Sequence, residues 1–235
     1  ATVHPGAVYL HMGDTYLVLH LDLETRVALV RPFWDTYHTQ ARRESDTRIV
    51  REHLQTAEGR LTLHLGEIMV TSRVVGFQRK RLGSDEVLGT EQLDMPAQEF
   101  ATESMWFTIP AELLSDPSDL ARLPGAIHAI EHALIALLPL YAMCDRWDIG
   151  GLSTPVHAQT EQPTIFVYDG HAGGVGISRQ GFERFAEWAR DARALIRDCP
   201  CESGCPSCIQ SPKCGNLNEP LDKEWALRLL DAMLC

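Results

Sequence analysis

The order of apolar and polar positions divides this chain into a strand-rich first half and a helical second half. Short β-branched and aromatic runs separated by turn residues predict hairpin-connected antiparallel strands. The predicted strands cover residues 6–11, 15–20, 26–31, 61–65, 68–77 and 96–109. Residues 41–60 are polar and charged and therefore predict a loop or an exposed connection.

The pattern changes to a helical one after Pro110. Residues 126–138 are apolar on most faces, which predicts a buried helix that begins after a turn at residues 123–125 and ends at Pro139. Residues 164–168 predict a buried strand, and residues 182–196 predict an amphipathic helix. A last helix is expected after Asp222 as N-cap, with four inward side chains: Trp225, Leu229, Leu230 and Met233.

These elements predict an α+β fold with two parts. Residues 1–109 form a β-rich subdomain, which is antiparallel and barrel-like, and residues 110–235 form a mainly helical subdomain with a few strands. A chain of 235 residues, 45% of them hydrophobic, is long enough to bury one large core or two modest ones.

Charge and targeting signals narrow the functional classes. Lys and Arg number 21 against 32 Asp and Glu, and the net charge of −11 argues against a freestanding high-affinity nucleic-acid binder. No long apolar run and no secretory signal is visible, so we expect no membrane span and a cytoplasmic location. Because the chain begins with Ala1, we expect an excised or processed piece.

The strongest chemical signal is a cysteine cluster. Five of the seven cysteines fall within sixteen residues, together with prolines and glycine: Cys199, Cys201, Cys205, Cys208 and Cys214. Cys205 and Cys208 form a C-x2-C knuckle, a spacing that lets two thiolates reach one zinc ion. Spacing alone leaves open which of Cys199, Cys201 and Cys214 complete the shell. We interpret the cluster as a structural zinc site.

These thiols allow two other interpretations. A disulfide cluster fits poorly, because Cys144 and Cys235 lie far away and an odd total leaves one thiol unpaired. An iron–sulfur cluster or a redox pair is the second alternative. Thiol usage of this kind is typical of a reducing compartment.

A second metal motif lies inside the predicted buried helix. His128, Glu131 and His132 match H-x-x-E-H, the inverted zinc-peptidase signature, and histidines four residues apart share a helix face. The peptidase needs an acidic third ligand on a later helix, and the sequence offers no convincing one. A core or interface role for the histidines is the simpler interpretation, and a zinc peptidase is an alternative function.

Residues 169–177 combine glycines with Asp169 and His171 after the predicted buried strand. A glycine-rich turn between strand and helix invites a nucleotide-binding interpretation, but the spacing matches neither dinucleotide nor P-loop patterns. Close backbone packing or turns with positive φ account for the glycines better. Asp169 and His171 remain candidates for a polar site.

Residues 78–81 contain the one dense basic run: Arg79, Lys80 and Arg81. These side chains are candidates for contacts to a nucleic-acid backbone. The alternative is a solvated strand end, which is how most charge runs behave.

Residues 199–216, with residues 218–223 behind them, resemble the C-terminal zinc-binding domain of MrfA/SftH-type superfamily II DNA helicases. The likeness covers most of residues 110–235. It implies the family spacing C-x-C-x3-C-x2-C, which falls on Cys199, Cys201, Cys205 and Cys208 and leaves Cys214 as an alternate ligand. The resemblance also implies a parent enzyme that moves 3′-to-5′ on single-stranded DNA, uses ATP and Mg²⁺, and acts in DNA repair.

The chain departs from the helicases in one respect, since it has no G-x-x-x-x-G-K-[ST] motif and no helicase acidic motif. We therefore expect no ATP hydrolysis by this chain itself, with ATP and Mg²⁺ bound only by motor domains of the parent protein. The expected role is an accessory module that guides or clamps single-stranded DNA in the nucleoid. A stand-alone interaction scaffold is a further alternative.

Overall fold

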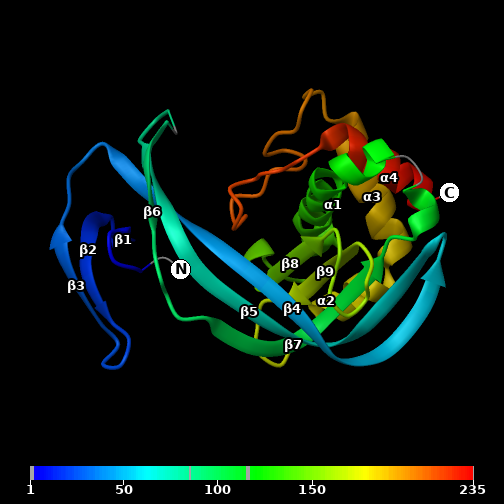
Figure 1. Cartoon of the computed structure of the whole chain (residues 1–235), viewed down its shortest axis with the longest axis horizontal. Coiled ribbons are helices and arrows are strands. Elements are labelled where there is room, and N and C mark those ends of the chain that lie inside the picture. Colours follow the sequence, from blue (N-terminus) through cyan, green and yellow to red (C-terminus); the bar gives the residue numbers. More distant parts are fainter. Residues whose placement is uncertain (1–2, 85, 115–116, 235) are drawn as a thin grey trace. The chain divides into compact units, whose positions relative to one another are not determined.

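The computed structural model describes residues 3–84, 86–114 and 117–234. Contacts divide the chain into two compact units, one made of Ala1–Glu44 and Ser72–Gln98, the other of Ser45–Thr71 and Glu99–Cys235. They do not follow the predicted division between residues 109 and 110, because two long strands run through both units. The mixed α+β class is confirmed (Figure 1).

The first unit contains a three-stranded antiparallel sheet in the order β1-β2-β3. Its strands are β1 (Val8–His11), β2 (Asp14–Asp22) and β3 (Val27–Pro32). They correspond to the first three predicted runs, and their antiparallel pairing confirms the predicted hairpins. Gly13 adopts φ +92 in the first turn, a conformation that glycine reaches without strain.

The remaining strands form a second, six-stranded sheet with the order β4-β5-β7-β9-β8, in which β6 also pairs with β5. The bounds are β4 (Tyr37–Glu58), β5 (Leu61–Arg81), β6 (Val87–Gln92), β7 (Gln98–Thr108), β8 (Ile149–Thr154) and β9 (Thr164–Asp169). The helices are α1 (Pro117–Leu137), α2 (Ile177–Glu183), α3 (Phe185–Asp198) and α4 (Lys223–Leu234), with 3-10 turns at Ala111–Leu113, Leu138–Leu140 and Arg146–Asp148.

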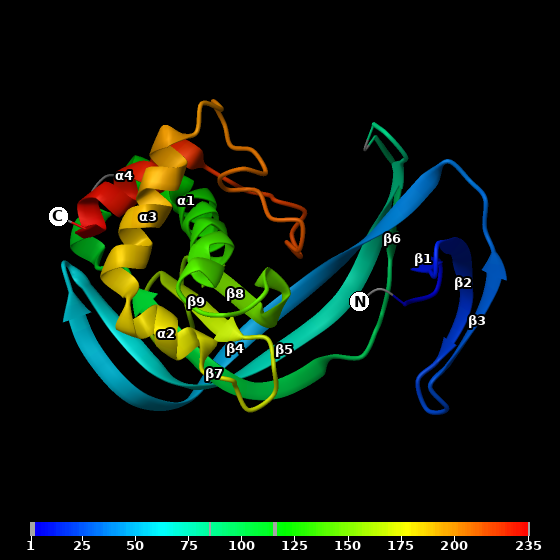
Figure 2. The same ribbon diagram turned by 180° about the vertical axis from the view of Figure 1, so that it is seen from behind.

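In the second unit, helices α1, α3 and α4 lie on one face of the sheet, over β8 and β9 (Figures 1 and 2). Side chains on β7 and β9 alternate between the two faces, as the pleat requires. Phe107 and Val167 join the large core under the helices, whereas Trp106 and Phe166 pack in a smaller cluster on the opposite face. One face of β7 and β9 thus packs against the helices.

Helix α1 is buried on most of its surface, as its all-round apolar pattern predicts. By length and composition it is the one helix, among the residues described, that meets the criteria for crossing a membrane, over Leu120–Leu140. Because 72% of that stretch is buried inside the chain, we assign it to the core. The helix ends before Pro139, as predicted.

Two predictions about the strands are wrong. Residues 41–60 belong mostly to β4, an edge strand whose side chains are exposed or half-buried except for the buried Thr47, so it lacks the apolar alternation that reveals strands. Residues 61–65 and 68–77 form one strand, β5, and were predicted as two because the buried positions change phase between Leu65 and Ile68. Gly66 lies at this change, and a Cβ there would meet the Arg51 carbonyl oxygen at 2.1 Å.

The predicted turn at residues 123–125 is also wrong, since α1 continues through Pro124 from Pro117 to Leu137. Proline cannot donate the helical hydrogen bond at its own position. Leu123 and Ala126 flank it and are buried in the large core, and this packing keeps the helix continuous. Local sequence signals are overridden here by tertiary contacts.

Candidate metal centre

The cysteine segment is held between two helices of the core. Helix α3 buries a stripe of apolar side chains against the sheet and α1: Phe185, Trp188, Ala189, Ala192 and Ile196. The helix ends at Asp198, and Cys199 follows in an extended conformation. Helix α4 begins at Lys223, and the side chain of Asp222 caps it by accepting from the Trp225 N–H at 3.0 Å, which confirms the predicted N-cap.

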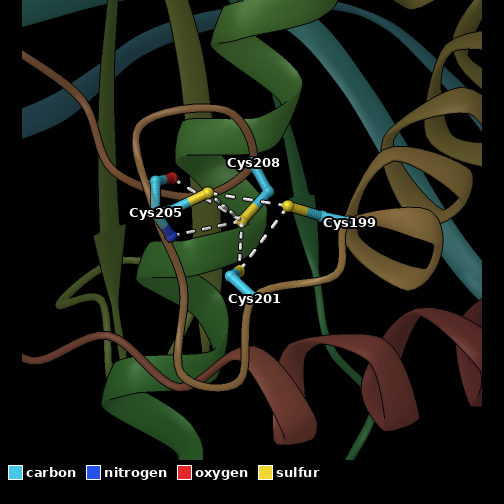
Figure 3. A group of neighbouring side chains, drawn as sticks. All are labelled: Cys199, Cys201, Cys205 and Cys208. Atoms are coloured by element: carbon cyan, nitrogen blue, oxygen red, sulfur yellow. Dashed lines mark hydrogen bonds between the residues drawn. The ribbon is translucent and has the colours of Figure 1, made fainter.

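Four of the five clustered cysteines converge on one point (Figure 3). Their sulfur atoms lie within 4.8 Å of one another. Four of the separations are 3.6 Å (Cys199–Cys201), 3.5 Å (Cys199–Cys205), 3.5 Å (Cys201–Cys208) and 3.8 Å (Cys205–Cys208). A tetrahedron of sulfurs about 2.3 Å from zinc has edges of roughly 3.8 Å, so the sulfur positions fit a zinc ion.

A tight turn shapes the C-x2-C knuckle. The carbonyl oxygen of Cys205 accepts the backbone N–H groups of Cys208, Ile209 and Gln210 at 3.0, 3.2 and 3.1 Å. The N–H of Cys205 donates to the sulfur of Cys208 at 3.4 Å. Gly204 precedes the turn with φ +112, and a Cβ there would meet Ile209 Cδ1 at 2.4 Å, so this position requires glycine.

Lys223 places a positive charge beside the thiols, which the sequence analysis missed. Its ammonium donates to the carbonyl oxygens of Cys199 at 2.7 Å and Cys201 at 2.5 Å, and lies 3.4 Å from the sulfur of Cys201. Four thiolates around a divalent zinc carry a net negative charge, which this ammonium partly offsets. A lysine at the first position of the following helix was the available signal.

The thiols differ in their protonation. Burial by itself disfavours the Cys201 thiolate, but hydrogen bonds from Cys208, Cys199 and Cys205, together with Lys223, outweigh it and lower the pKa of Cys201 to about 6. Burial raises the pKa of Cys208 to about 12. The metal-free cluster therefore retains protons at neutral pH, and a metal ion must displace them to bind.

Cys214 lies outside this group of four and against α1. Its sulfur is 3.3 Å from Nε2 of His128, and it groups with His128 and His132 in a second cluster whose ligand atoms lie within 4.8 Å of one another. The alternate role of Cys214 in the four-cysteine site is therefore not supported by its position. Burial lowers the pKa of His128, and burial with the charge of His128 lowers that of His132 to about 4.

Glu131, the third member of H-x-x-E-H, is directed to a different partner. Its carboxylate accepts a hydrogen bond from the Ser153 hydroxyl at 2.7 Å, and the residue is 7% exposed. Burial raises the pKa of Glu131 to about 7. This carboxylate is engaged with β8, so the arrangement does not favour the peptidase alternative.

The glycine-rich turn binds a carboxylate of the chain itself. Both oxygens of the fully buried Asp169 accept from residues at the start of α2: the N–H groups of Val175, Gly176, Ile177 and Ser178 and the Ser178 hydroxyl, at 2.5–3.2 Å. The amides that a phosphate would need are thus occupied. Gly173, Gly174 and Gly176 have φ of +84, +73 and +87, which confirms the predicted positive-φ turn.

The basic run, expected directly after the strand that carries Phe77, forms the last residues of that strand, β5, which ends at Arg81. Arg79 pairs with Glu91 at 2.9 Å and Arg81 pairs with Glu86 at 2.8 Å, both at partly exposed positions. Exposed pairs of this kind are weak, so the arginines can exchange partners at low cost. Contacts between these residues and DNA stay a prediction.

His171, named with Asp169 as a candidate for a polar site, places its Nε2 atom 3.0 Å from Oδ1 of Asp148.

Comparison with known proteins places these features in a family. Residues 130–209 match the family MZB, described as MrfA Zn-binding domain. The uncharacterized protein MJ1572.1 of Methanocaldococcus jannaschii is 37% identical over 111 residues, which is 99% of that protein and 46% of this chain. The chain belongs to the MrfA zinc-binding domain family. The matched residues contain all four convergent cysteines, together with Glu131 and His132 of the H-x-x-E-H motif, and begin two positions after His128.

Longer relatives extend the likeness over the whole chain. The uncharacterized ATP-dependent helicase YprA of Bacillus subtilis is 32% identical over 233 residues, covering 98% of this chain and 30% of that protein. The crystal structure of the DUF1998 helicase MrfA bound to DNA matches with a TM-score of 0.61 and 31% identity, over 99% of this chain and 30% of the other. The chain therefore spans about a third of the length of these helicases. The family identifies the expected metal as zinc in a structural role.

Proposed function

We propose that this chain is the zinc-stabilised accessory region of an ATP-dependent DNA helicase. The main support for this proposal is the tetrahedral arrangement of four sulfur atoms, in a chain that is similar to helicases along almost its whole length. In this proposal Cys199, Cys201, Cys205 and Cys208 hold one structural zinc ion. Motor domains elsewhere in the parent protein bind ATP and Mg²⁺.

The region's proposed task is to guide or clamp single-stranded DNA beside those motor domains, as part of 3′-to-5′ unwinding in DNA repair. A solved relative is bound to DNA, which supports DNA as the partner. Arg79, Lys80 and Arg81 are the proposed backbone contacts, because exposed basic groups bind phosphates without sequence preference. A cytoplasmic location at the nucleoid belongs to the same proposal.

The test uses the full-length protein that contains this chain. Unwinding of duplexes with a 3′ or a 5′ single-stranded tail is measured beside DNA-stimulated ATP hydrolysis, for wild type, Cys205→Ser and the control Cys144→Ser. We expect Cys205→Ser to lose zinc and unwinding while ATP hydrolysis persists, and Cys144→Ser to behave as wild type. Undiminished unwinding by a Cys205→Ser protein that has lost the zinc ion of the four-cysteine site refutes the accessory role, and a full-length protein without DNA-stimulated ATP hydrolysis refutes the class.

A further inference from the structure

A second group of metal-ligating side chains lies where α1 meets the segment before α4. His128 and His132 are four residues apart on one face of α1, and their ring centroids are 4.3 Å apart. Cys214, 86 positions further along the chain from His128, places its sulfur 3.3 Å from Nε2 of His128. The three ligand atoms lie within 4.8 Å of one another, and both histidines are buried.

Both imidazoles are oriented by backbone carbonyl groups. Nδ1 of His128 lies 2.8 Å from the carbonyl oxygen of Pro220, and Nδ1 of His132 lies 2.7 Å from that of Ile209. A carbonyl oxygen can only accept, so each Nδ1 carries the proton and each Nε2 presents its lone pair. Metal-ligating histidines show this arrangement, in which an outer hydrogen bond fixes the tautomer and the ring.

Hydrogen bonds also hold the Cys214 sulfur in position. The backbone N–H of Asn218 donates to the sulfur of Cys214 at 3.3 Å. Asn218 also closes the loop, because its side chain accepts from the Ser211 N–H at 2.7 Å and donates to the Ser211 carbonyl at 3.1 Å. The loop thus holds the sulfur toward α1.

We propose that Nε2 of His128, Nε2 of His132 and Sγ of Cys214 form a second metal site, whose ion is zinc. Two imidazoles and one thiolate are a donor set that zinc accepts, and a fourth position is left for water or another donor. The ion fastens residues 209–220 to the middle of α1. This site is distinct from the four-cysteine site, since the two share no ligand.

The two sites are adjacent in the chain. Ile209, whose carbonyl oxygen orients His132, directly follows Cys208, a member of the four-cysteine group. A single segment therefore carries ligands of one site and the orienting carbonyl of the other. Each site is expected to hold its ion when the other is removed, with reduced affinity.

The experiment is a count of zinc in the purified full-length protein by elemental analysis, made as a difference between variants. We expect Cys214→Ser and His132→Gln each to lose one equivalent relative to wild type, and Cys205→Ser to lose one as well. Combining Cys214→Ser with Cys205→Ser is expected to lose two. The control Cys144→Ser changes a thiol outside both clusters and should keep the wild-type content.

Unchanged zinc content in Cys214→Ser overturns the proposal, whatever happens in Cys205→Ser. If Cys214→Ser unfolds and loses all zinc, titration of metal-stripped wild type with Co²⁺ decides instead. Two saturable binding steps support the second site, provided that one of them shows the weaker sulfur-to-cobalt absorption expected of a single thiolate. A single step with the absorption of four thiolates refutes it while leaving the four-cysteine site intact.

Discussion

Replacing Asp169 by asparagine tests whether the glycine-rich turn is built around an internal carboxylate. The side chain is fully buried and accepts hydrogen bonds from four backbone N–H groups and one hydroxyl. Asparagine has nearly the same shape, but it exchanges one oxygen for an amide that donates. The substitution therefore changes the chemistry of the contact and leaves its volume almost unchanged.

The expected loss of folding stability follows from how the hydrogen-bond donors are divided between the two carboxylate oxygens of Asp169. Three N–H groups, of Val175, Gly176 and Ile177, point at one oxygen, and the Ser178 N–H and hydroxyl point at the other. In the less destabilising orientation, the asparagine NH2 group replaces the oxygen that faces Ser178. The Ser178 hydroxyl can rotate away from this NH2 group, but the Ser178 backbone N–H cannot. At least one buried N–H then loses its acceptor, and the others lose a charged one, which together cost about 2–4 kcal/mol.

The assay is equilibrium urea unfolding in zinc-containing buffer, monitored by tryptophan fluorescence. Trp188 of α3, which is buried in the core, contributes to this signal. A loss of this size corresponds to a fall in Tm of roughly 5–15 °C for a chain of this length. Glu187→Gln is the control, since this exposed residue pairs with Arg184 across one helical turn and its change should cost below about 0.5 kcal/mol. Stability of Asp169→Asn within 0.5 kcal/mol of wild type would show that the carboxylate does not organise the turn.

Other measurements address the zinc site and the basic run. Zinc removal by a chelator, or Cys208→Ser, is expected to raise hydrogen exchange at the end of α3 and the start of α4, and unchanged protection would contradict a structural metal. Lys223→Met is expected to weaken zinc binding about tenfold in competition titrations, whereas Lys223→Arg retains most of it. The pH dependence of zinc affinity should steepen below about pH 6, where Cys201, whose pKa is lowered to about 6 in the metal-free cluster, adds its proton to the competition; a slope that is the same above and below pH 6 would refute this. Charge reversal at Arg79 and Lys80 should reduce the salt dependence of single-strand binding, with a slope change of about 0.7 per lost phosphate contact, and an unchanged slope would exclude them.

The sequence was most informative where chemistry depends on short spacing. Cys205 and Cys208 are three positions apart, and such a spacing nearly determines that both sulfurs reach one ion. Cys199 and Cys201 entered the predicted ligand set through the family resemblance, and the structure brings their sulfurs to the same point. Asp222 was recognisable as an N-cap because the capping signal is local.

Long-range neighbours were the part that the sequence could not supply. No pattern links His128 with Cys214, since their approach depends on how α1 crosses the loop before α4. Strand β4 was missed for a related reason, because an edge strand with almost no buried side chains has no apolar period. In both cases the deciding contacts are made with distant elements.

The segment between α3 and α4 is ordered mainly by polar atoms rather than by apolar burial. Of residues 199–222 only Cys208 and Ile209 are buried, so the hydrophobic contribution of this segment is small beside the conformational entropy lost in ordering it. The remaining fixed points are the convergent sulfurs, the ammonium of Lys223 and the carbonyl groups that orient two imidazoles. A segment of this composition needs strong, localised bonds, and metal–thiolate bonds supply them. The core of β7, β9 and α1 is built mainly from the apolar side chains of those elements, and the segment joins it through Cys208 and Ile209.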